Sequence, residues 1–148
     1  MTAAAGEAAG RTAAGEAVPV APPQVAGVAL LLWAADPGAP ERLATPFFHA
    51  AAAAAFDVPV EVFFSAASVR LLAPGVAEAL RASERHPKTV LDAMREAVAH
   101  GAVFHACTDA LAAHGLADSA LIPECTRRGG AVQFMARALD PRWRALVF

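Results

Sequence analysis

Apolar runs and helix-like segments alternate along the chain from residue 25 to its end. Continuous runs of Val, Leu and Phe are typical of strands buried on both faces of a sheet, and apolar residues spaced three and four apart indicate helices. The predicted strands span residues 25–33, 58–65, 102–106, 122–126 or just after, and 142–148. The predicted helices span residues 42–57, 87–101 and 131–139, with two shorter ones after Gly75 and before Gly115.

Strands that alternate with helices predict a parallel sheet covered on both faces. The expected fold class is α/β, a three-layer α/β/α sandwich with a mainly parallel sheet of about five strands. Residues 1–24, in contrast, consist largely of Ala, Gly, Glu and Pro without apolar periodicity. The predicted organisation is therefore a disordered tail over residues 1–24 and one α/β domain over residues 25–148.

Composition and charge narrow the classes of partner. The longest apolar stretch, residues 25–35, is shorter than the roughly 20 residues that cross a bilayer. The N-terminus has no basic region before an apolar segment, so a secretory signal is not expected. The net charge of −2 argues against nucleic acid or an anionic membrane as a direct partner. These features predict a soluble, cytoplasmic protein.

The sequence lacks the patterns that hold a metal or a nucleotide cofactor. Cys107 and Cys125 do not form a Cys-x-x-Cys motif, and Cys/His spacing typical of structural zinc is missing. A Gly-x-Gly-x-x-Gly fingerprint is also missing, which argues against a nucleotide-binding Rossmann fold. Neither a metal nor another cofactor is therefore expected. Two cysteines without a secretory signal also favour free thiols in a reducing compartment.

Cys107 follows the third predicted strand and precedes a short predicted helix. This position puts its thiol at the carboxyl edge of the sheet, where open α/β folds bind ligands. Amide groups in the first turn of a helix carry partial positive charge and would stabilise a thiolate or a persulfide anion. Thr108 and Asp109 are residue types that cap a helix N-terminus. The alternative is that Cys107 packs as a small apolar residue.

Two further residues are candidates for chemistry with Cys107. His105 lies two positions earlier and would share a strand face with it, which permits a Cys/His pair. The alternative for His105 is a packed or half-exposed strand residue. Cys125 would either form a disulfide with Cys107, accept its sulfur, or fill the core.

Large apolar side chains raise the question of assembly. Trp33, Phe47, Phe48 and Trp143 present more apolar surface than one small core easily hides. Exposed apolar patches often mark interfaces, so these residues favour an oligomer. The alternative is that the core takes them all.

Four stretches of the sequence resemble the DsrE/DsrF-like (YchN-like) family of small sulfur-relay proteins. The family's second strand and following loop are similar to VEVFFSAASVRLL, and its helix, strand, cysteine and helix to VLDAMREAVAHGAVFHACTDALAAHGL. Its last helix and closing strand are similar to GGAVQFMARAL and RALVF. The resemblance extends over about residues 25–148 and implies the same α/β/α fold.

The resemblance also implies a function and partners. In sulfur-transferring members, the cysteine after the third strand carries a persulfide and passes its outer sulfur to a partner thiol; here that cysteine is Cys107. Members form trimers or hexamers of one chain or of related chains, and they receive sulfur from small carrier proteins. They serve transfer-RNA thiolation or sulfur oxidation, and the RNA is handled elsewhere. Where many relatives have Asp-Gly, this chain has SAASV, in which Ser65 and Ser68 would offer hydroxyls at the mouth of the site.

Three hypotheses follow. The first is a sulfurtransferase-like persulfide carrier in which Cys107 reacts. The residues expected to line its binding site are Ser65, Ser68, His105, Thr108 and Asp109. The second is a non-catalytic, homo-oligomeric DsrE-like scaffold or small-ligand-binding module with an unreactive Cys107. The third is a peroxide-type redox role that needs a disulfide between Cys107 and Cys125.

Overall fold

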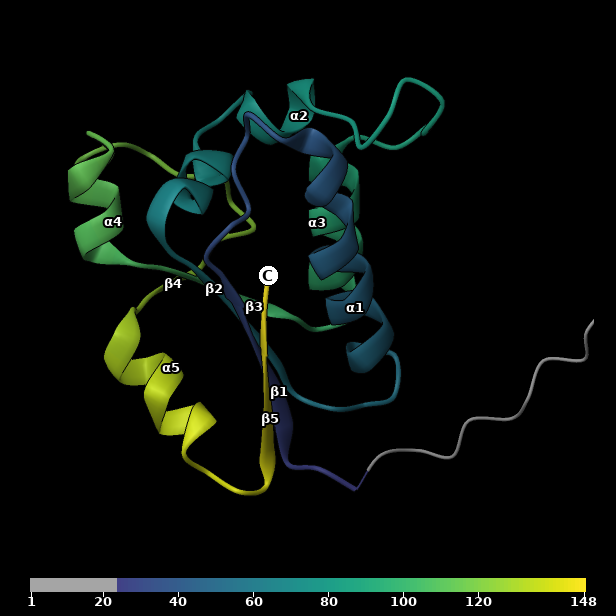
Figure 1. Ribbon diagram of the computed structural model, residues 1–148, viewed down its shortest axis with the longest axis vertical. Helices are drawn as coiled ribbons and strands as arrows, with labels where there is room; N and C mark the ends of the chain where they lie inside the picture. Colours follow the sequence, from purple (N-terminus) through teal and green to yellow (C-terminus); the bar gives the residue numbers. More distant parts are fainter. Residues whose placement is uncertain (1–23) are drawn as a thin grey trace, which may run out of the picture.

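The computed structural model describes residues 24–148, so the predicted disordered tail, apart from its last residue, lies outside the described part. Five strands of this part form one sheet in which every neighbouring pair is parallel (Figure 1). In chain order they are β1 (Gly27–Leu32), β2 (Val60–Phe64), β3 (Val103–Ala106), β4 (Arg127–Arg128) and β5 (Trp143–Val147). The order across the sheet is β4-β3-β2-β1-β5. The predicted parallel α/β sheet is confirmed.

Helices cover both faces of this sheet. They are α1 (Ala44–Ala54), α2 (Val76–Ala79), α3 (Val90–Ala99), α4 (Thr108–Ala113) and α5 (Ala131–Ala138), with the 3-10 helices η1 (Pro40–Arg42) and η2 (Ala66–Leu72). Figure 1 shows α1 and α3 together against one face and α5 against the other. The short helices α2 and α4 lie toward the carboxyl ends of the strands. The molecule thus has the three predicted layers. The outer layer formed by α5 is much thinner than the outer layer formed by α1 and α3.

Local sequence explains where the helices of the thicker layer begin. Pro46 is the third residue of α1, where its missing N–H costs no intrahelical hydrogen bond. At α3, the Thr89 hydroxyl accepts a hydrogen bond from the Asp92 amide (3.1 Å), and the Asp92 carboxylate accepts one from the Thr89 amide (2.8 Å). This reciprocal cap starts α3 at Val90 instead of the predicted residue 87. Gly101, with a φ of 106°, follows the helix.

The segment after β2 differs from the prediction. The sequence pattern indicates a loop there, whereas residues 66–72 form η2 with Val69, Leu71 and Leu72 fully buried. Burial of these side chains holds the segment against the main core. The fourth strand is shorter than average and begins at Arg127, just after the expected residues 122–126.

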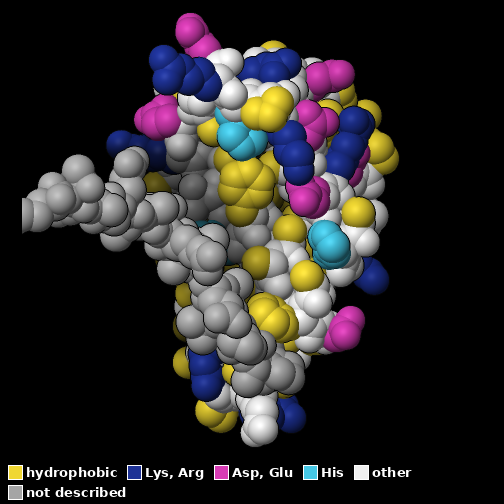
Figure 2. All heavy atoms as spheres, turned by 90° about the vertical axis from the view of Figure 1, so that its right-hand side faces the viewer, with side chains coloured by type: hydrophobic (Ala, Val, Ile, Leu, Met, Phe, Trp, Pro, Cys, Tyr) yellow, Lys and Arg dark blue, Asp and Glu magenta, His cyan; other side chains and the backbone are white. Residues whose placement is uncertain are grey.

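The two faces of the sheet carry cores of very different size. Between the sheet and the α1/α3 layer, the fully buried rings of Phe47, Phe64 and Phe104 lie with centroids 5.1 to 6.0 Å apart. Under α5, the buried cluster of the described residues consists of Ala29, Phe63 and Phe134. Figure 2 views the α1/α3 side, where charged side chains gather in the upper part and hydrophobic atoms show as separate spots. That side of the protein is closed by packing, whereas the α5 side is only partly covered.

The large apolar residues singled out in the sequence divide between core and surface. Phe47 is fully buried, whereas Trp33 and Phe48 are 66% and 39% exposed. Trp143 is half-buried, with the Arg137 guanidinium 4.3 Å from its ring centroid. The core therefore takes only part of this set.

Within residues 24–148, every helix is too short or too polar to cross a membrane.

Candidate functional site

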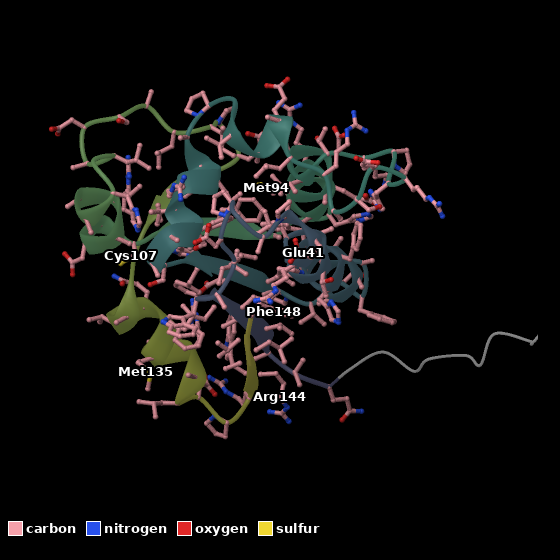
Figure 3. The ribbon with its side chains drawn as sticks, turned by 45° about the horizontal axis from the view of Figure 1, so that its top comes forward. Glu41, Met94, Cys107, Met135, Arg144 and Phe148 are labelled. Atoms are coloured by element: carbon pink, nitrogen blue, oxygen red, sulfur yellow. The ribbon has the colours of Figure 1, made fainter. Side chains whose placement is uncertain are left out.

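Cys107 joins β3 to α4. Its N–H donates a hydrogen bond to the Phe64 carbonyl oxygen (3.0 Å), which continues the pairing of β2 and β3 beyond the strand. Its carbonyl oxygen accepts a hydrogen bond from the Leu111 amide (2.9 Å), the first of α4. Backbone hydrogen bonds on both sides therefore hold Cys107 at the carboxyl edge of the sheet. Figure 3 labels Cys107 near the start of α4.

The helix cap differs from the expected one. Thr108 and Asp109 are the first two residues of α4, and Cys107 itself occupies the N-cap position with extended backbone angles (φ −68°, ψ 118°). The Cys107 side chain makes no capping hydrogen bond. The first-turn amides of α4 therefore have no side-chain acceptor from the cap residue. The side chains of Thr108 and Asp109 are exposed.

The half-buried Cys107 thiol lines a pocket of about 290 Å³. The remaining lining comes from the carboxyl ends of β1 and β2 and from the start of α5: Leu31, Phe63, Phe64, Ser65, Gly130, Ala131, Phe134 and Met135. In Figure 3, Cys107 and Met135 mark two sides of this region, on the β3–α4 joint and on α5. We call it the thiol pocket.

The chain leading into α5 approaches the sulfur closely because residue 130 is glycine. A Cβ atom at Gly130 would lie 3.1 Å from Cys107 Sγ, closer than ordinary van der Waals contact. A Cβ atom at Gly129 would lie 3.2 Å from His105 Nδ1. The two glycines therefore let the backbone pack directly on the β3–α4 joint. Neither glycine is among the site residues predicted from the sequence, although a Gly-Gly pair before an amphipathic helix is a visible signal.

Only one of the two predicted serines lines the thiol pocket. Ser65 does so, whereas Ser68 is fully buried in η2. The Ser68 hydroxyl donates a hydrogen bond to the Leu32 carbonyl oxygen (2.9 Å). The same hydroxyl accepts a hydrogen bond from the Ser65 amide (2.9 Å). The expectation that both hydroxyls line the mouth is wrong for Ser68, because these backbone contacts commit its hydroxyl to the turn after β2.

His105 does not pair with Cys107. Its ring stacks on Phe63, with centroids 4.5 Å apart, and neither of its ring nitrogens has a hydrogen-bond partner among the described residues. Burial lowers the pKa of His105, against the opposing effect of the Glu61 carboxylate 3.9 Å from Nε2. Of the two alternatives for His105, the structure has the packed strand residue and not the Cys/His pair. The lowered pKa leaves the imidazole largely neutral at neutral pH.

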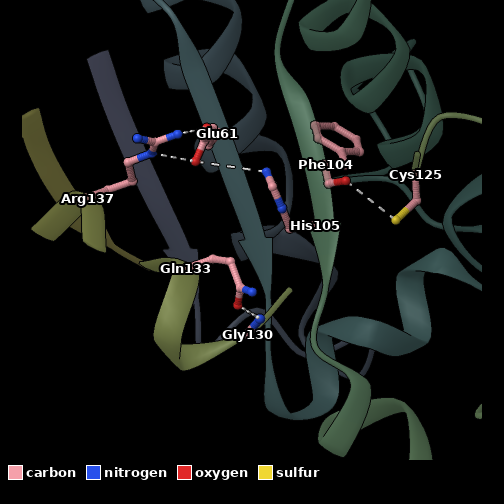
Figure 4. Close-up of polar contacts among 7 residues, drawn as sticks. All are labelled: Glu61, Phe104, His105, Cys125, Gly130, Gln133 and Arg137. Carbon is pink, nitrogen blue, oxygen red and sulfur yellow. Dashed lines mark hydrogen bonds and ion pairs between the residues drawn. The ribbon is translucent and has the colours of Figure 1, made fainter. Parts of the chain in front are cut away.

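The His105 ring lines a second pocket of about 200 Å³ under α5, together with Glu61, Gln133, Ala136 and Arg137. The Glu61 carboxylate accepts two hydrogen bonds from the Arg137 guanidinium, at 3.0 and 2.8 Å. Figure 4 shows this group on one side of β3 and Cys125 on the other. Phe63 is the link between the two pockets, because it lines the thiol pocket and also carries the stacked imidazole.

Cys125 is held apart from the thiol pocket. Its thiol lies 3.7 Å from the Phe104 carbonyl oxygen and 3.6 Å from that of Arg127. Burial raises the pKa of Cys125, which keeps the thiol protonated near neutral pH and lowers its nucleophilicity. Cys107 and Cys125 are both free in the structure.

A third pocket, of about 350 Å³, lies near the ends of β1 and β5 and is lined in part by the charged residues Glu41 and Arg42. Of the three pockets, only the thiol pocket has a cysteine in its lining. In the part of the chain that the structure describes, His, Cys, Asp and Glu side chains do not gather in groups of three that would hold a metal ion.

A parallel five-stranded sheet with helices on both faces places the protein in the α/β class. Residues 28–148 match the model of the DsrE/DsrF-like family, and the chain therefore belongs to this family. The family is associated with sulfur relay, and its members are often oligomeric. The sequence has no match among the curated proteins.

Two solved structures have a similar fold. The ychN protein from E. coli gives a TM-score of 0.62 at 16% sequence identity, and the match covers 82% of this chain and 98% of that chain. MTH1491, a protein of unknown function from Methanobacterium thermoautotrophicum, gives 0.56 at 19% identity, over 82% of this chain and 97% of that one. At such low identities the likeness is one of fold alone.

Proposed function

We propose that the protein is a sulfur-relay protein that accepts a sulfane sulfur on Cys107, holds it as a persulfide and passes it to a second thiol. One observation carries the proposal: in a chain of a family associated with sulfur relay, a half-buried thiol lines a pocket at the carboxyl edge of the sheet. A cysteine that served only as core filler would not need an adjoining pocket.

The proposed transfer uses neither a cofactor nor an external oxidant. The Cys107 thiolate attacks the outer sulfur of a donor persulfide, R–S–SH. A bond forms between Sγ and that sulfur, the donor S–S bond breaks, and the donor leaves as R–S⁻. In the second half, an acceptor thiolate attacks the outer sulfur and Cys107 leaves as a thiolate. The transferred atom keeps its oxidation state throughout.

Stabilisation of anionic sulfur is the main requirement of this chemistry. Two helices begin beside the thiol pocket, α4 directly after Cys107 and α5 directly after Gly130. The amides in the first turn of a helix have no intrahelical acceptor and carry partial positive charge. In this proposal they favour the thiolate in both half-reactions, and the close approach at Gly130 brings the backbone of α5 to the sulfur.

The proposed donor is a small sulfur-carrier protein that docks at the rim of the thiol pocket. The exposed side chains of Thr108 and Asp109 lie on the first turn of α4, beside the thiol, and would contact it. The Ser65 hydroxyl would contact the ligand inside the pocket. We further propose that the chain binds neither nucleic acid nor membranes and works in the cytoplasm.

We also propose that the chain forms a homo-oligomer, a trimer or a hexamer. The α5 side exposes large apolar residues, among them Val132 (80%), Leu139 (75%) and Val147 of the edge strand (63%). Exposed apolar patches of this kind favour association. If Cys107 proves unreactive, this assembly is the alternative function, as a non-catalytic scaffold or a small-ligand-binding module.

The test is persulfide formation, read by peptide mass spectrometry. The wild-type, Cys107→Ser and Cys125→Ser proteins are incubated with an organic persulfide and analysed for the mass of one added sulfur atom. We expect the adduct on Cys107 in the wild-type and Cys125→Ser proteins, and none on the Cys107→Ser protein with an unchanged circular dichroism spectrum. Label on Cys125 that requires Cys107 would identify Cys125 as an internal acceptor.

Two results would contradict the assignment. Equal sulfur uptake by the Cys107→Ser protein would place the chemistry elsewhere. Absence of an adduct on all three proteins would leave the scaffold or ligand-binding module as the function. A disulfide between Cys107 and Cys125 after peroxide treatment would instead favour the redox role.

A further inference from the structure

The thiol pocket is larger than the transfer of one sulfur atom requires. Its volume is about 290 Å³, whereas an apolar cavity of about 150 Å³ already holds a benzene-sized molecule. Apolar side chains from three elements form its walls: Leu31, Phe63, Phe134 and Met135. A small organic group therefore fits beside the sulfur atom of Cys107.

The lining of the thiol pocket contains no charged side chain. The other two pockets differ in this respect, because one is lined by Glu41 and Arg42 and the other by Glu61 and Arg137. The only side-chain polar groups in the thiol pocket are the Ser65 hydroxyl and the thiol itself. The first-turn amides of α4 and α5 lie at the sulfur atom and not along the apolar walls. A charge on the organic part of a ligand, against those walls, would lose its hydration without gaining an ion-pair partner, and this loss is unfavourable.

We infer that the acceptor of the sulfur held on Cys107 is a small, uncharged, apolar thiol, aliphatic or aromatic. Charged thiols of the cysteine or glutathione type are disfavoured. The inference rests on the proposed function, since it names the second partner of the same cysteine. The organic group R occupies the thiol pocket, and R–S⁻ attacks the outer sulfur of the Cys107 persulfide. An S–S bond forms in the product R–S–SH, and the bond to Sγ breaks as Cys107 leaves as a thiolate.

Two thiol reagents of equal chemistry test the pocket without any sulfur loading. Benzyl methanethiosulfonate and sulfonatoethyl methanethiosulfonate both transfer an R–S group to a thiolate and release methanesulfinate, but only the second carries a negative charge. Rates of modification at Cys107 of the full chain are measured by peptide mass spectrometry. The rate ratio, benzyl over sulfonatoethyl, is divided by the same ratio for the urea-unfolded chain. We expect a normalised ratio of about tenfold or more, because an apolar pocket excludes unpaired charge.

A variant pair shows whether the thiol pocket causes the preference. Met135 lines the pocket and is 44% exposed, so Met135→Lys adds a charge to the lining without removing a core residue. Ala113→Lys adds the same charge at the last residue of α4, which is exposed and lies outside the lining. We expect the normalised ratio to fall several-fold, toward one, in the Met135→Lys protein and to stay high in the Ala113→Lys protein.

The possible outcomes separate this inference from the proposed function. A normalised ratio near one in the wild-type protein overturns the inference. Slow modification by both reagents, the result expected if a second subunit covers the pocket, overturns it as well. Either result leaves the persulfide experiment unaffected. If the normalised ratio is high but the protein fails to form a persulfide, the apolar preference of the pocket stands and the proposed sulfur-relay function is overturned. If the two lysine substitutions change the normalised ratio equally, the pocket lining does not cause the preference for the uncharged reagent.

Discussion

The two faces of the sheet use the same strands for different purposes. Toward α1 and α3, alternate strand residues such as Phe64 and Phe104 enter a continuous, fully buried core. Toward α5, the neighbouring positions hold Phe63 and His105, and the buried cluster is small. The thiol pocket and the His105 pocket lie on the α5 side and along its edge.

The difference shows how one domain separates stability from chemistry. Two packed helices close one face, whereas α5 is too short to cover the other and leaves room on both of its sides. A polar group such as Glu61 is tolerated there because Arg137 from α5 supplies its partner. We therefore expect substitutions on the α1/α3 face to change stability, and substitutions around α5 to change reactivity and titration.

The largest expected effect is on the free energy of unfolding. Phe47→Ala removes a fully buried ring that contacts two other rings and should cost about 3–5 kcal/mol. Phe134→Ala should cost clearly less, because the Phe134 ring adjoins the thiol pocket and therefore has fewer packing contacts to lose. Urea unfolding of the two variants measures this difference. Equal losses would contradict the contrast between the faces.

The next effect concerns reactivity at the thiol pocket. In the Gly130→Ala protein, the new Cβ would lie 3.1 Å from Cys107 Sγ, so we expect alkylation of Cys107 to slow by about tenfold. Gly129→Ala is the matched control, because its Cβ would crowd the His105 ring instead. Alkylation rates near neutral pH provide the measurement. Equal slowing in both variants would mean that general distortion of the turn, and not contact with the sulfur, is responsible.

A smaller effect is expected at the ion pair under α5. Glu61→Gln removes the negative partner of Arg137, whose side chain is 40% exposed, so the loss of stability should be only about 1 kcal/mol. The same change removes the charge that raises the pKa of His105 and should lower that pKa further. Nuclear magnetic resonance titration of the His105 ring measures the shift. Glu96→Gln is the control, because it removes the exposed ion-pair partner of Lys88 at a residue on α3. It should leave the titration of His105 unchanged.

The smallest effect is a pH dependence of stability. Because burial holds the pKa of folded His105 below its ordinary value of 6.5, the unfolded chain binds the proton first as the pH falls. Stability should therefore decline from pH 6.5 down through the folded pKa, and His105 should contribute no change above that window. His105→Phe keeps a ring against Phe63 and should flatten this part of the profile. An unchanged slope in urea midpoints would show that other groups cause it.

The sequence alone predicts the elements well, because apolar runs and helical spacing report directly on burial. It also places Cys107 at a strand–helix joint, which depends only on local order along the chain. It fails for Ser68 and leaves two alternatives open for His105, because the neighbours of both residues come from segments distant in sequence. The Leu32 carbonyl, 36 residues away in sequence, accepts the Ser68 hydrogen bond. The His105 ring stacks on Phe63 from β2.

The approach of α5 to the sulfur is another feature that local pattern does not reveal. The apolar residues of its sequence predict a buried helix face, but not which part of that face adjoins the thiol. The three-dimensional structure shows that Phe134 and Met135 form a wall of the pocket and that Gly130 brings the start of α5 against Cys107. Pockets arise where packing between distant elements is incomplete, and such gaps have no signature in the sequence itself.

Competition between the two thiols tests the account most directly. The native wild-type protein is treated near neutral pH with less than one equivalent of a neutral alkylating reagent, and the label on Cys107 and Cys125 is counted by peptide mass spectrometry. We predict at least about tenfold more label on Cys107, because it lines an open pocket whereas burial raises the pKa of Cys125. Equal labelling, or faster labelling of Cys125, would contradict the claim that Cys107 is the reactive thiol.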